Sequence, residues 1–393
     1  MASKFSCLKT PLRKNGIKNL IHLVEKHITD PRRTSYGHIK YTLTFIVVIY
    51  IVAKICGMSS FREVEDFGKS HIVFFGKFFE IKNNAIPSAE RYRLVMSYID
   101  SEELLSVYRD FFSINKNILY KKLHIAIDGK NVNGSRRRDE NAKNIVSAIN
   151  SEFDAIISQS IVDEKDSEIF AMLELITYMG KVGYKNLIIT GDAIYAQINI
   201  VDQIIKYGWN YCFSLKGNQG KLFNVAKLIF EKVKDNPFSK DQNNLHGRRV
   251  YREFYYVENV KKFCIENNIK YNGKWETIPS IGIVKSRRIE LEKDSTEVRY
   301  YITSLKDKNE FKTYATRHWY IENNLHWQLD TTYCEDSSRI YDKNLVMNNN
   351  ICLKFGLKIC NIGLEYYNKP NMTLTRIKKL MLMNPYNIEE FIG

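Results

Sequence analysis

The chain has no long apolar run and no pattern typical of an exported protein. Its most apolar stretch, residues 41–53 (YTLTFIVVIYIVA), is followed by Lys54 and falls well short of the ~20 residues that a membrane-spanning helix needs. Residues 1–19 are largely polar and basic and lack the apolar segment of a secretory signal peptide. The sequence therefore predicts a cytoplasmic protein without a membrane anchor.

Cysteine is sparse, and its spacing has no pattern. The seven cysteines are scattered along the chain, and no two of them form a C-x-x-C pair. This argues against a disulfide framework and against a structural zinc site, and it fits a reducing compartment. The chain also lacks internal repeats and low-complexity segments, which argues against a repeat architecture.

Acidic residues are fewer than basic ones. The 59 Lys and Arg against 44 Asp and Glu give a net charge of +15. Such an excess favours a polyanionic partner such as nucleic acid or an anionic membrane, although many basic proteins have neither. The 393 residues are enough for two or three domains, and 44% apolar residues are ordinary for a soluble globular protein.

The N-terminal part of the chain is predicted to be a basic arm followed by a helical domain. Residues 1–20 form the arm, which either orders on phosphate or remains a solvated terminus. Residues 21–115 have a helical pattern, with a capping box expected between Ser60 and Glu63 and a second N-cap at Ser88. This domain is predicted to bind DNA, with packing or dimerisation as the alternative.

From Lys121 the pattern changes to short strands that alternate with helices, which is typical of an α/β sheet. Residues 121–215 are the first part of this core. Residues 216–305 contain several strand-like runs and are predicted to be a mostly β insertion. The core resumes with helices over residues 306–370, and a tail covers residues 371–393.

Two aspartates stand at the ends of short apolar runs. Asp128 follows LHIAI, and Asp192 follows LIITG. If the two strands are parallel neighbours, the carboxylates converge at one edge of the sheet. Such charges repel unless divalent cations lie between them, and oxygen ligands without a Cys or His cluster indicate Mg²⁺ or Mn²⁺. The alternative is that each aspartate caps a turn.

A third acid on a predicted helix is the best candidate to complete a two-ion site. Glu322 lies in the segment RHWYIENNLHW, where helical spacing puts His318, Glu322 and His326 on one face. Trp319 and Trp327 are eight residues apart and are expected to pack onto the sheet. The alternative for Glu322 is an ion pair on the helix surface.

Several motifs occur in one order along the chain: SSFREVEDFG, IPSAERYR, IAIDGK, TGDAIYAQ, FSLKGNQ, HGRR and HWYIENNLHWQLDTTYCEDSSR. In these motifs the chain resembles the DDE transposases of bacterial insertion sequences, especially the branch that includes the H-repeat-associated proteins. The resemblance covers nearly the whole chain. It implies an α/β protein with a ribonuclease H-like catalytic core, a mixed sheet flanked by helices. The β insertion would precede the last catalytic helix, and an all-helical domain would precede the core.

The resemblance implies that Asp128, Asp192 and Glu322 are the catalytic and metal-binding triad, with two Mg²⁺ ions or Mn²⁺ in their place. One ion would activate the attacking oxygen, and the other would stabilise the leaving 3′ oxygen. The implied reaction is cleavage of double-stranded DNA at the terminal inverted repeats of an element and transfer of the 3′-OH ends into target DNA. A homodimer in the DNA complex and a place at the bacterial nucleoid are expected.

The chain departs from the Tyr, Arg, Glu, Lys signature that related transposases carry around the last acid. Arg317 lies one residue farther from Glu322 than usual, His318 takes the place of that Arg, and Leu329 stands where a Lys is common. The DNA 5′ phosphate is therefore expected to meet Arg317, His318 or His326.

Further DNA contacts are predicted at polar or basic residues that follow strand ends or lie in turns, where simple solvation or turn formation is the alternative. They are Lys130, Arg136, Arg137, Lys216, Asn218, Gln219 and Arg248. Two other functions remain open: a domesticated metal-dependent nuclease without transposition, and a DNA-binding regulator without catalysis.

Overall fold

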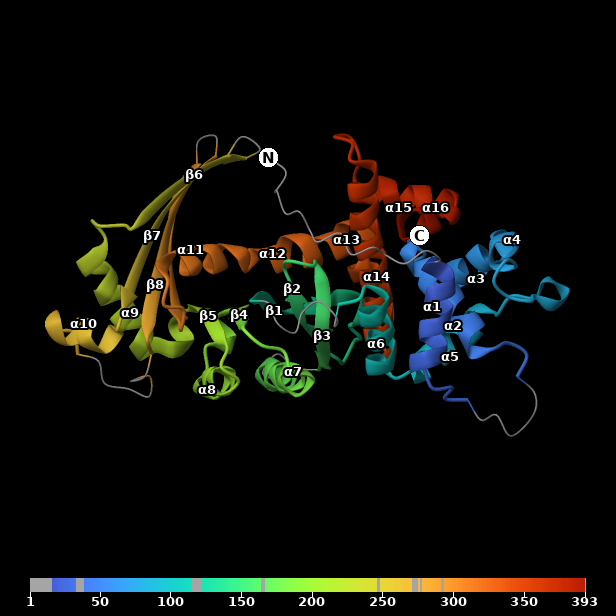
Figure 1. The fold of residues 1–393 in the computed structure, drawn as a ribbon, viewed down its shortest axis with the longest axis horizontal. Coiled ribbons are helices and arrows are strands. Elements are labelled where there is room, and N and C mark those ends of the chain that lie inside the picture. The colour runs from blue at the N-terminus through green and yellow to red at the C-terminus, as the bar shows by residue number, and fades with distance from the viewer. Residues whose placement is uncertain are drawn as a thin grey trace.

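The computed structural model describes residues 16–32, 39–114, 122–163, 167–245, 248–270, 275, 278–290 and 293–392. Most of the predicted basic arm lies outside these residues. The molecule is elongated, with a helical unit at one end, a sheet with helices in the middle, and long strands at the other end (Figure 1).

The N-terminal residues form helices only, within the part that the structure describes. Ser60 and Glu63 form the predicted capping box of α3, and the Ser88 side chain accepts a hydrogen bond from the backbone N–H of Arg91. The helices are α1 (Gly16–His27), α2 (Leu43–Ile55), α3 (Phe61–Ser70), α4 (Ile72–Phe75), α5 (Ala89–Tyr98) and α6 (Ser101–Phe111), with a short 3₁₀ turn η2 (Lys82–Asn84).

Helix α2 contains the apolar run of residues 41–53 and is buried on almost every side. It packs against α14 (Lys343–Tyr367), a long helix that also reaches β2 and β3 of the sheet. The predicted tail forms α15 (Leu374–Met383) and α16 (Tyr386–Ile392), which close the helical unit from the other end of the chain. None of the described helices combines the length and apolarity that crossing a membrane requires.

The core is a mixed α/β structure around a nine-stranded sheet in the order β3-β2-β1-β4-β5-β9-β8-β7-β6. Strands β1, β4 and β5 run parallel, and every other neighbouring pair is antiparallel. The bounds are β1 (Leu123–Val132), β2 (Lys143–Asn150), β3 (Ala155–Val162), β4 (Leu187–Gly191), β5 (Asn210–Leu215), β6 (Ser239–Leu245), β7 (Arg248–Glu258), β8 (Ser280–Glu290) and β9 (Lys293–Thr303).

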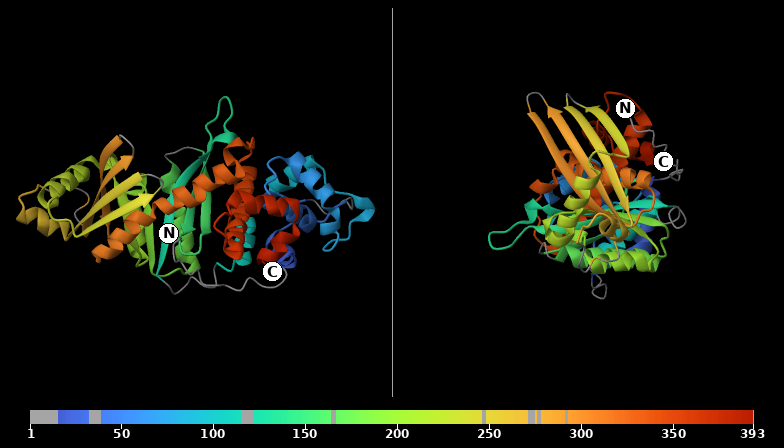
Figure 2. Two further views of the ribbon diagram at one scale, coloured as in Figure 1. Left: turned by 90° about the horizontal axis from the view of Figure 1, so that it is seen from above. Right: turned by 90° about the vertical axis from the view of Figure 1, so that its left-hand side faces the viewer.

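Helices cover the two sides of this sheet. Helices α7 (Glu168–Val182) and α8 (Ile198–Lys206) lie on one side. On the other side, α11 (Lys308–Arg317), α12 (Trp319–Ile321) and α13 (Trp327–Tyr333) form a line from the long strands to the helical unit (Figures 1 and 2).

Strands β6–β9, together with α9 (Gly220–Val233) and α10 (Val260–Glu266), make up the insertion. It does not form a separate sheet, because β9 pairs with β5 of the core. Its contact with α11 depends on Gly282: a Cβ there would lie 2.2 Å from the ring of Phe311. Since such contact is not possible for a side-chain carbon, glycine lets this helix approach the strands closely.

One local expectation is wrong. The strand that begins at Leu123 does not end at Asp128 but continues to Val132, because β2 pairs with it along this whole stretch. Asp128 therefore lies inside a strand, whereas Asp192 directly follows β4.

Candidate active site

The sheet register brings the two aspartates side by side. Strands β1 and β4 are parallel neighbours, and Ile127 pairs with Gly191. The next residues along these strands are Asp128 and Asp192, so both emerge at the same edge, as the sequence predicts. The Asp128 side chain is 20% exposed and that of Asp192 is 45% exposed.

The acids influence one another electrostatically. Burial is the main cause that raises the pKa of Asp128 to about 7, and the negative charges of Asp192 and Glu322 add to it. The nearby His318 and the backbone N–H of Gly129 act in the opposite direction. Glu322 is thus close enough to raise the pKa of Asp128, although its own side chain is exposed.

Each aspartate has an imidazole beside it. The Nε2 of His318 lies 3.6 Å from Oδ1 of Asp192, and the Nε2 of His326 lies 3.7 Å from Oδ2 of Asp128. Both Nε2 atoms are buried and have no hydrogen-bond partner among the described residues. Burial lowers the pKa of His326 to about 3, so this ring is neutral near pH 7.

The neighbours of Asp192, by contrast, favour its charged form. Its pKa is lowered, chiefly by His318 and further by Lys216 and Arg299, against the effect of burial. Asp192 therefore carries its negative charge more readily than Asp128 does. Asp192 can therefore stay ionised on its own, whereas ionisation of Asp128 would be favoured by a cation bound between the two carboxylates.

A buried hydrogen-bonded chain holds His318 in place. Its Nδ1 lies 3.1 Å from the hydroxyl of Thr190, which lies 2.8 Å from Nε2 of His124. The Nδ1 of His124 in turn lies 2.7 Å from the hydroxyl of Ser151. Because Thr190 is fully buried, this chain fixes the orientation of the ring that faces Asp192.

Glu322 begins a π-helical segment, η7 (Glu322–His326), between α12 and α13. The backbone N–H of Trp327 donates to the carbonyl of Glu322, five residues earlier. Such segments occur frequently at functional sites. In the described ranges, no three His, Cys, Asp or Glu side chains are placed to hold one metal ion together.

The three residues near Glu322 that are predicted to meet the DNA 5′ phosphate have different partners in the structure. His318 and His326 face the aspartates, whereas the guanidinium of Arg317 pairs with Glu152 at 2.8 Å. The expectation that Trp327 packs onto the sheet is wrong, because its side chain is 58% exposed.

Lys130 is held by acids of the protein itself. Its Nζ lies 2.5 Å from Asp330 and 2.5 Å from Glu335, and its side chain is only 13% exposed. A DNA phosphate would have to displace one of these carboxylates. Lys130 therefore anchors α13 and the turn after it to β1.

Asn218 and Gln219 support the segment that follows Asp192. Asn218 donates to the carbonyl of Ala193 at 2.7 Å, and Gln219 donates to that of Ala196 at 3.0 Å. In the structure, the side chains of Asn218 and Gln219 thus stabilise the turn, which is the alternative to a DNA contact. Lys216, just before them, is exposed and lies within electrostatic range of Asp192.

The remaining predicted contacts lie farther along the strands. Arg136 and Arg137 are exposed in the turn after β1, where Arg137 lies over the ring of Tyr341 at 4.8 Å. Arg248 begins β7, but its side chain is outside the described part of the chain, as is His246.

Sequence reasoning missed Thr190 and Arg299. Thr190 is an ordinary strand residue in LIITG, and Arg299 lies in the insertion, more than a hundred residues from Asp192. No local pattern indicates either residue, because only the sheet pairing brings them to the acids.

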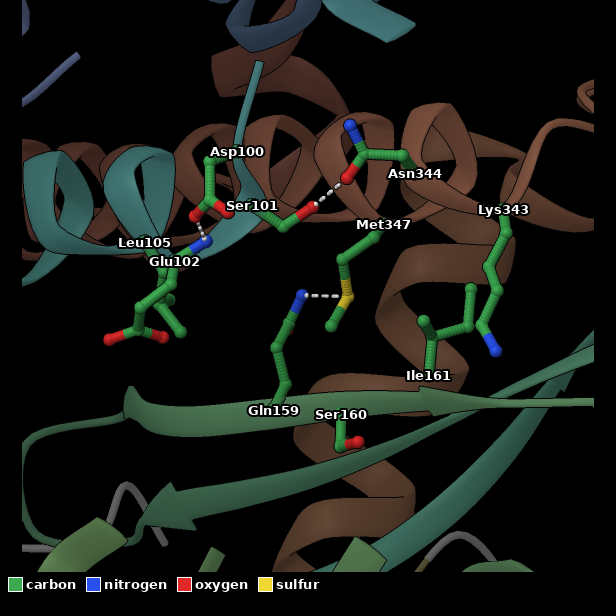
Figure 3. Close-up of a pocket in the computed structure, with 10 residues that line it drawn as sticks. All are labelled: Asp100, Ser101, Glu102, Leu105, Gln159, Ser160, Ile161, Lys343, Asn344 and Met347. Atoms are coloured by element: carbon green, nitrogen blue, oxygen red, sulfur yellow. Dashed lines mark hydrogen bonds between the residues drawn. The ribbon is translucent and has the colours of Figure 1, made fainter. Parts of the chain in front are cut away.

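A pocket of about 400 Å³ lies away from the acids, where α6, β3 and α14 meet (Figure 3). Its lining includes Asp100, Gln159, Lys343 and Met347, and the amide of Gln159 points to the sulfur of Met347. None of the proposed catalytic acids lines it, so this pocket is separate from the candidate site.

Comparison with known proteins identifies the parts of this chain. Residues 119–355 match the family model described as "Transposase DDE domain", and residues 24–112 match the one described as "DDE_Tnp_1-associated". The chain is 31% identical over 316 residues to "Putative transposase YncI" of Escherichia coli O157:H7, covering 77% of this chain and 78% of that protein. It is 30% identical over 328 residues to "H repeat-associated putative transposase YhhI" of Escherichia coli K12, covering 80% and 82%.

Proposed function

Because the chain belongs to the family of transposases with a DDE domain, we propose that it cleaves DNA at the ends of a mobile element and transfers the 3′-OH ends into target DNA. The observation that carries this proposal is the adjacent placement of Asp128 and Asp192 on parallel strands, within the electrostatic range of Glu322. We assign the order β3-β2-β1-β4-β5, with β2 and β3 antiparallel, to a ribonuclease H-like core.

The two aspartates fit a divalent metal ion. Burial and like charge raise the pKa of Asp128 to about 7, and a cation between the carboxylates would relieve this repulsion. Mg²⁺ is commonly held by one or two carboxylates, with water and substrate phosphate oxygens completing its shell, so a preformed three-ligand cage is not required. When bound, two Mg²⁺ or Mn²⁺ ions would supply an activated oxygen nucleophile and stabilise charge at the scissile phosphate.

The protein itself supplies orientation and charge. His318 holds Asp192 in its ionised form, and the buried chain through Thr190 fixes that ring. Glu322, exposed at the start of η7, would complete the triad when DNA binds. Of the three candidates for the 5′ phosphate, His318 and His326 already face the acids, whereas Arg317 would first have to leave Glu152.

The proposed partners are the double-stranded ends of the element, the target DNA and a second copy of the chain. The net charge of +15 suits binding to DNA at the bacterial nucleoid. We assign contacts with DNA to the helical unit and to the exposed Arg136, Arg137 and Lys216, since these are open to solvent.

The test replaces one acid without changing its shape. Asp128→Asn removes an unfavourably buried charge, so the variant should fold, yet Mg²⁺-dependent cleavage of a duplex carrying the element's end should fall at least ~10³-fold. Asp163→Asn is the matched control, because Asp163 is a half-exposed acid that pairs with Lys143 and Lys343.

The same assay separates the alternatives. Joining of pre-cut ends with free 3′-hydroxyls identifies a transposase, whereas cleavage without joining identifies a nuclease. If Asp128→Asn cleaves DNA as fast as the wild type, the acids are not catalytic. If Mg²⁺ affects DNA binding only through salt screening and supports no cleavage, the chain is a DNA-binding regulator without catalysis.

A further inference from the structure

Three arginines from adjacent strands of the insertion share one face of the sheet. In the register, Val250 of β7 pairs with Arg288 of β8, and Val284 of β8 pairs with Arg299 of β9. Residues that are paired, or two apart along a strand, point to the same side. Arg252, Arg288 and Arg299 therefore lie on one face, the side on which α11 packs.

Trp319 lies between two of these arginines. The guanidinium carbon of Arg252 is 5.4 Å from the centre of the Trp319 ring, and that of Arg299 is 4.4 Å from it. Contact with the ring face holds a guanidinium in place while its N–H groups remain able to donate. Trp319 is only three residues before Glu322, so the pair is held beside the proposed site.

The charge of this cluster is only partly compensated. Arg299 pairs with Glu297 at 2.8 Å. Arg288 is exposed and makes no ion pair with any residue that the structure describes. The cluster therefore carries positive charge that an anion could neutralise.

Arg252 has one donor group without an acceptor, although its Nη1 donates to the side-chain oxygen of Asn243 at 3.3 Å. Its Nε is buried without a hydrogen-bond partner among the described residues. The nearby Asp241 is already paired with Lys312 at 2.6 Å. Burial lowers the pKa of Arg252, and the charges of Arg288 and Arg299 lower it further. An anion bound here would supply the missing acceptor and offset the repulsion.

The cluster lies beside the proposed site, since Trp319, which contacts Arg252 and Arg299, is in the helical segment directly before Glu322. We propose that Arg252, Arg288 and Arg299, arranged around Trp319, bind phosphates of the DNA backbone next to the scissile bond. The proposal rests on the transposase function proposed above. Planar guanidinium groups match the oxygens of a phosphodiester, and a position beside the acids suits DNA better than an acidic protein.

The test measures how DNA affinity depends on salt. Arg288→Gln and Arg252→Gln are made in the full-length protein, and binding of a fluorescent duplex with the terminal repeat is titrated at several NaCl concentrations. Each phosphate contact that is lost should reduce the slope of log K against log[salt] by about one. At low salt, Kd should rise about tenfold for each variant.

Arg287→Gln is the matched control. Arg287 is the neighbour of Arg288 on β8 but faces the other side of the sheet, where it pairs with Asp294 at 2.5 Å. The variant Arg287→Gln should leave both Kd and the slope of log K against log[salt] unchanged. Arg288→Lys keeps the charge and should restore the slope with a smaller loss of affinity. Arg288 is exposed, so its replacement should not prevent folding.

The outcomes separate this proposal from the proposed function. If the wild type cleaves DNA but Arg288→Gln and Arg252→Gln keep the slope of Arg287→Gln, the phosphate site is refuted and the transposase function stands. If the wild type neither binds nor cleaves the duplex, the proposed function itself fails. If Arg288→Gln weakens binding of polyglutamate but not of DNA, the surface binds an acidic protein and the proposal is overturned.

Discussion

Replacing Thr190 by Val tests whether the buried chain behind the aspartates serves catalysis. The two side chains have nearly the same shape, but valine lacks the hydroxyl that lies 2.8 Å from His124 and 3.1 Å from His318. Both imidazoles would lose a hydrogen-bond partner at the centre of the sheet. His318 would no longer be fixed against Asp192.

The structure sets the size of two separate effects. Leaving a buried polar group without a partner costs about 1–3 kcal/mol, so two nitrogens should lower the free energy of unfolding by about 2–6 kcal/mol. Loss of the group that orients a ligand side chain typically costs 10- to 100-fold in activity. Urea unfolding measures the first effect, and single-turnover DNA cleavage at saturating Mg²⁺ measures the second.

Thr303→Val is the matched control for Thr190→Val. Thr303 is also a fully buried strand threonine, and its hydroxyl donates to the carbonyl of Tyr211 at 2.8 Å and accepts from the backbone N–H of Leu305. Both variants should lose similar stability, but only Thr190→Val should slow cleavage when each is fully folded. Equal cleavage rates for the two variants would refute the role of the chain in orienting His318.

Two further predictions concern stability. Burial lowers the pKa of Lys354 to about 7 from 10.5; above pH 7 the unfolded chain then binds more protons, so the free energy of unfolding should rise by up to about 5 kcal/mol between pH 7 and 10.5. Lys354→Met should remove this rise in urea titrations across that range, and an unchanged rise would contradict the assignment. Gly282→Ala would place a Cβ 2.2 Å from the ring of Phe311 and should cost about 1–3 kcal/mol; an unchanged urea midpoint would show that α11 can move away freely.

The convergence of the aspartates could be predicted because it depends on local patterns. Short apolar runs before Asp128 and Asp192 indicate buried strands, and helices between strands favour parallel neighbours. The pairing of β1 with β4 confirms this expectation. The capping box at Ser60 was predictable for the same reason, since its two partners are three residues apart.

Other features depend on contacts that no local pattern encodes. Strand β1 continues past Asp128 because β2 supplies partners for its backbone, and Lys130 is bound by acids two hundred residues away. The π segment after Glu322 and the exposure of Trp327 are likewise not indicated by any local pattern. The arginines around Trp319 come from three consecutive strands, and only the register of the sheet places their side chains on one face.

The packing of α2 against α14 has a consequence for synthesis of the chain. The strongly apolar α2 is synthesised well before α14, the helix against which it packs. Its core contacts are incomplete until α14 has left the ribosome, so an apolar surface of α2 stays uncovered while the segments between the two helices are made. A message truncated before residue 343 would yield an aggregation-prone fragment with no finished helical unit.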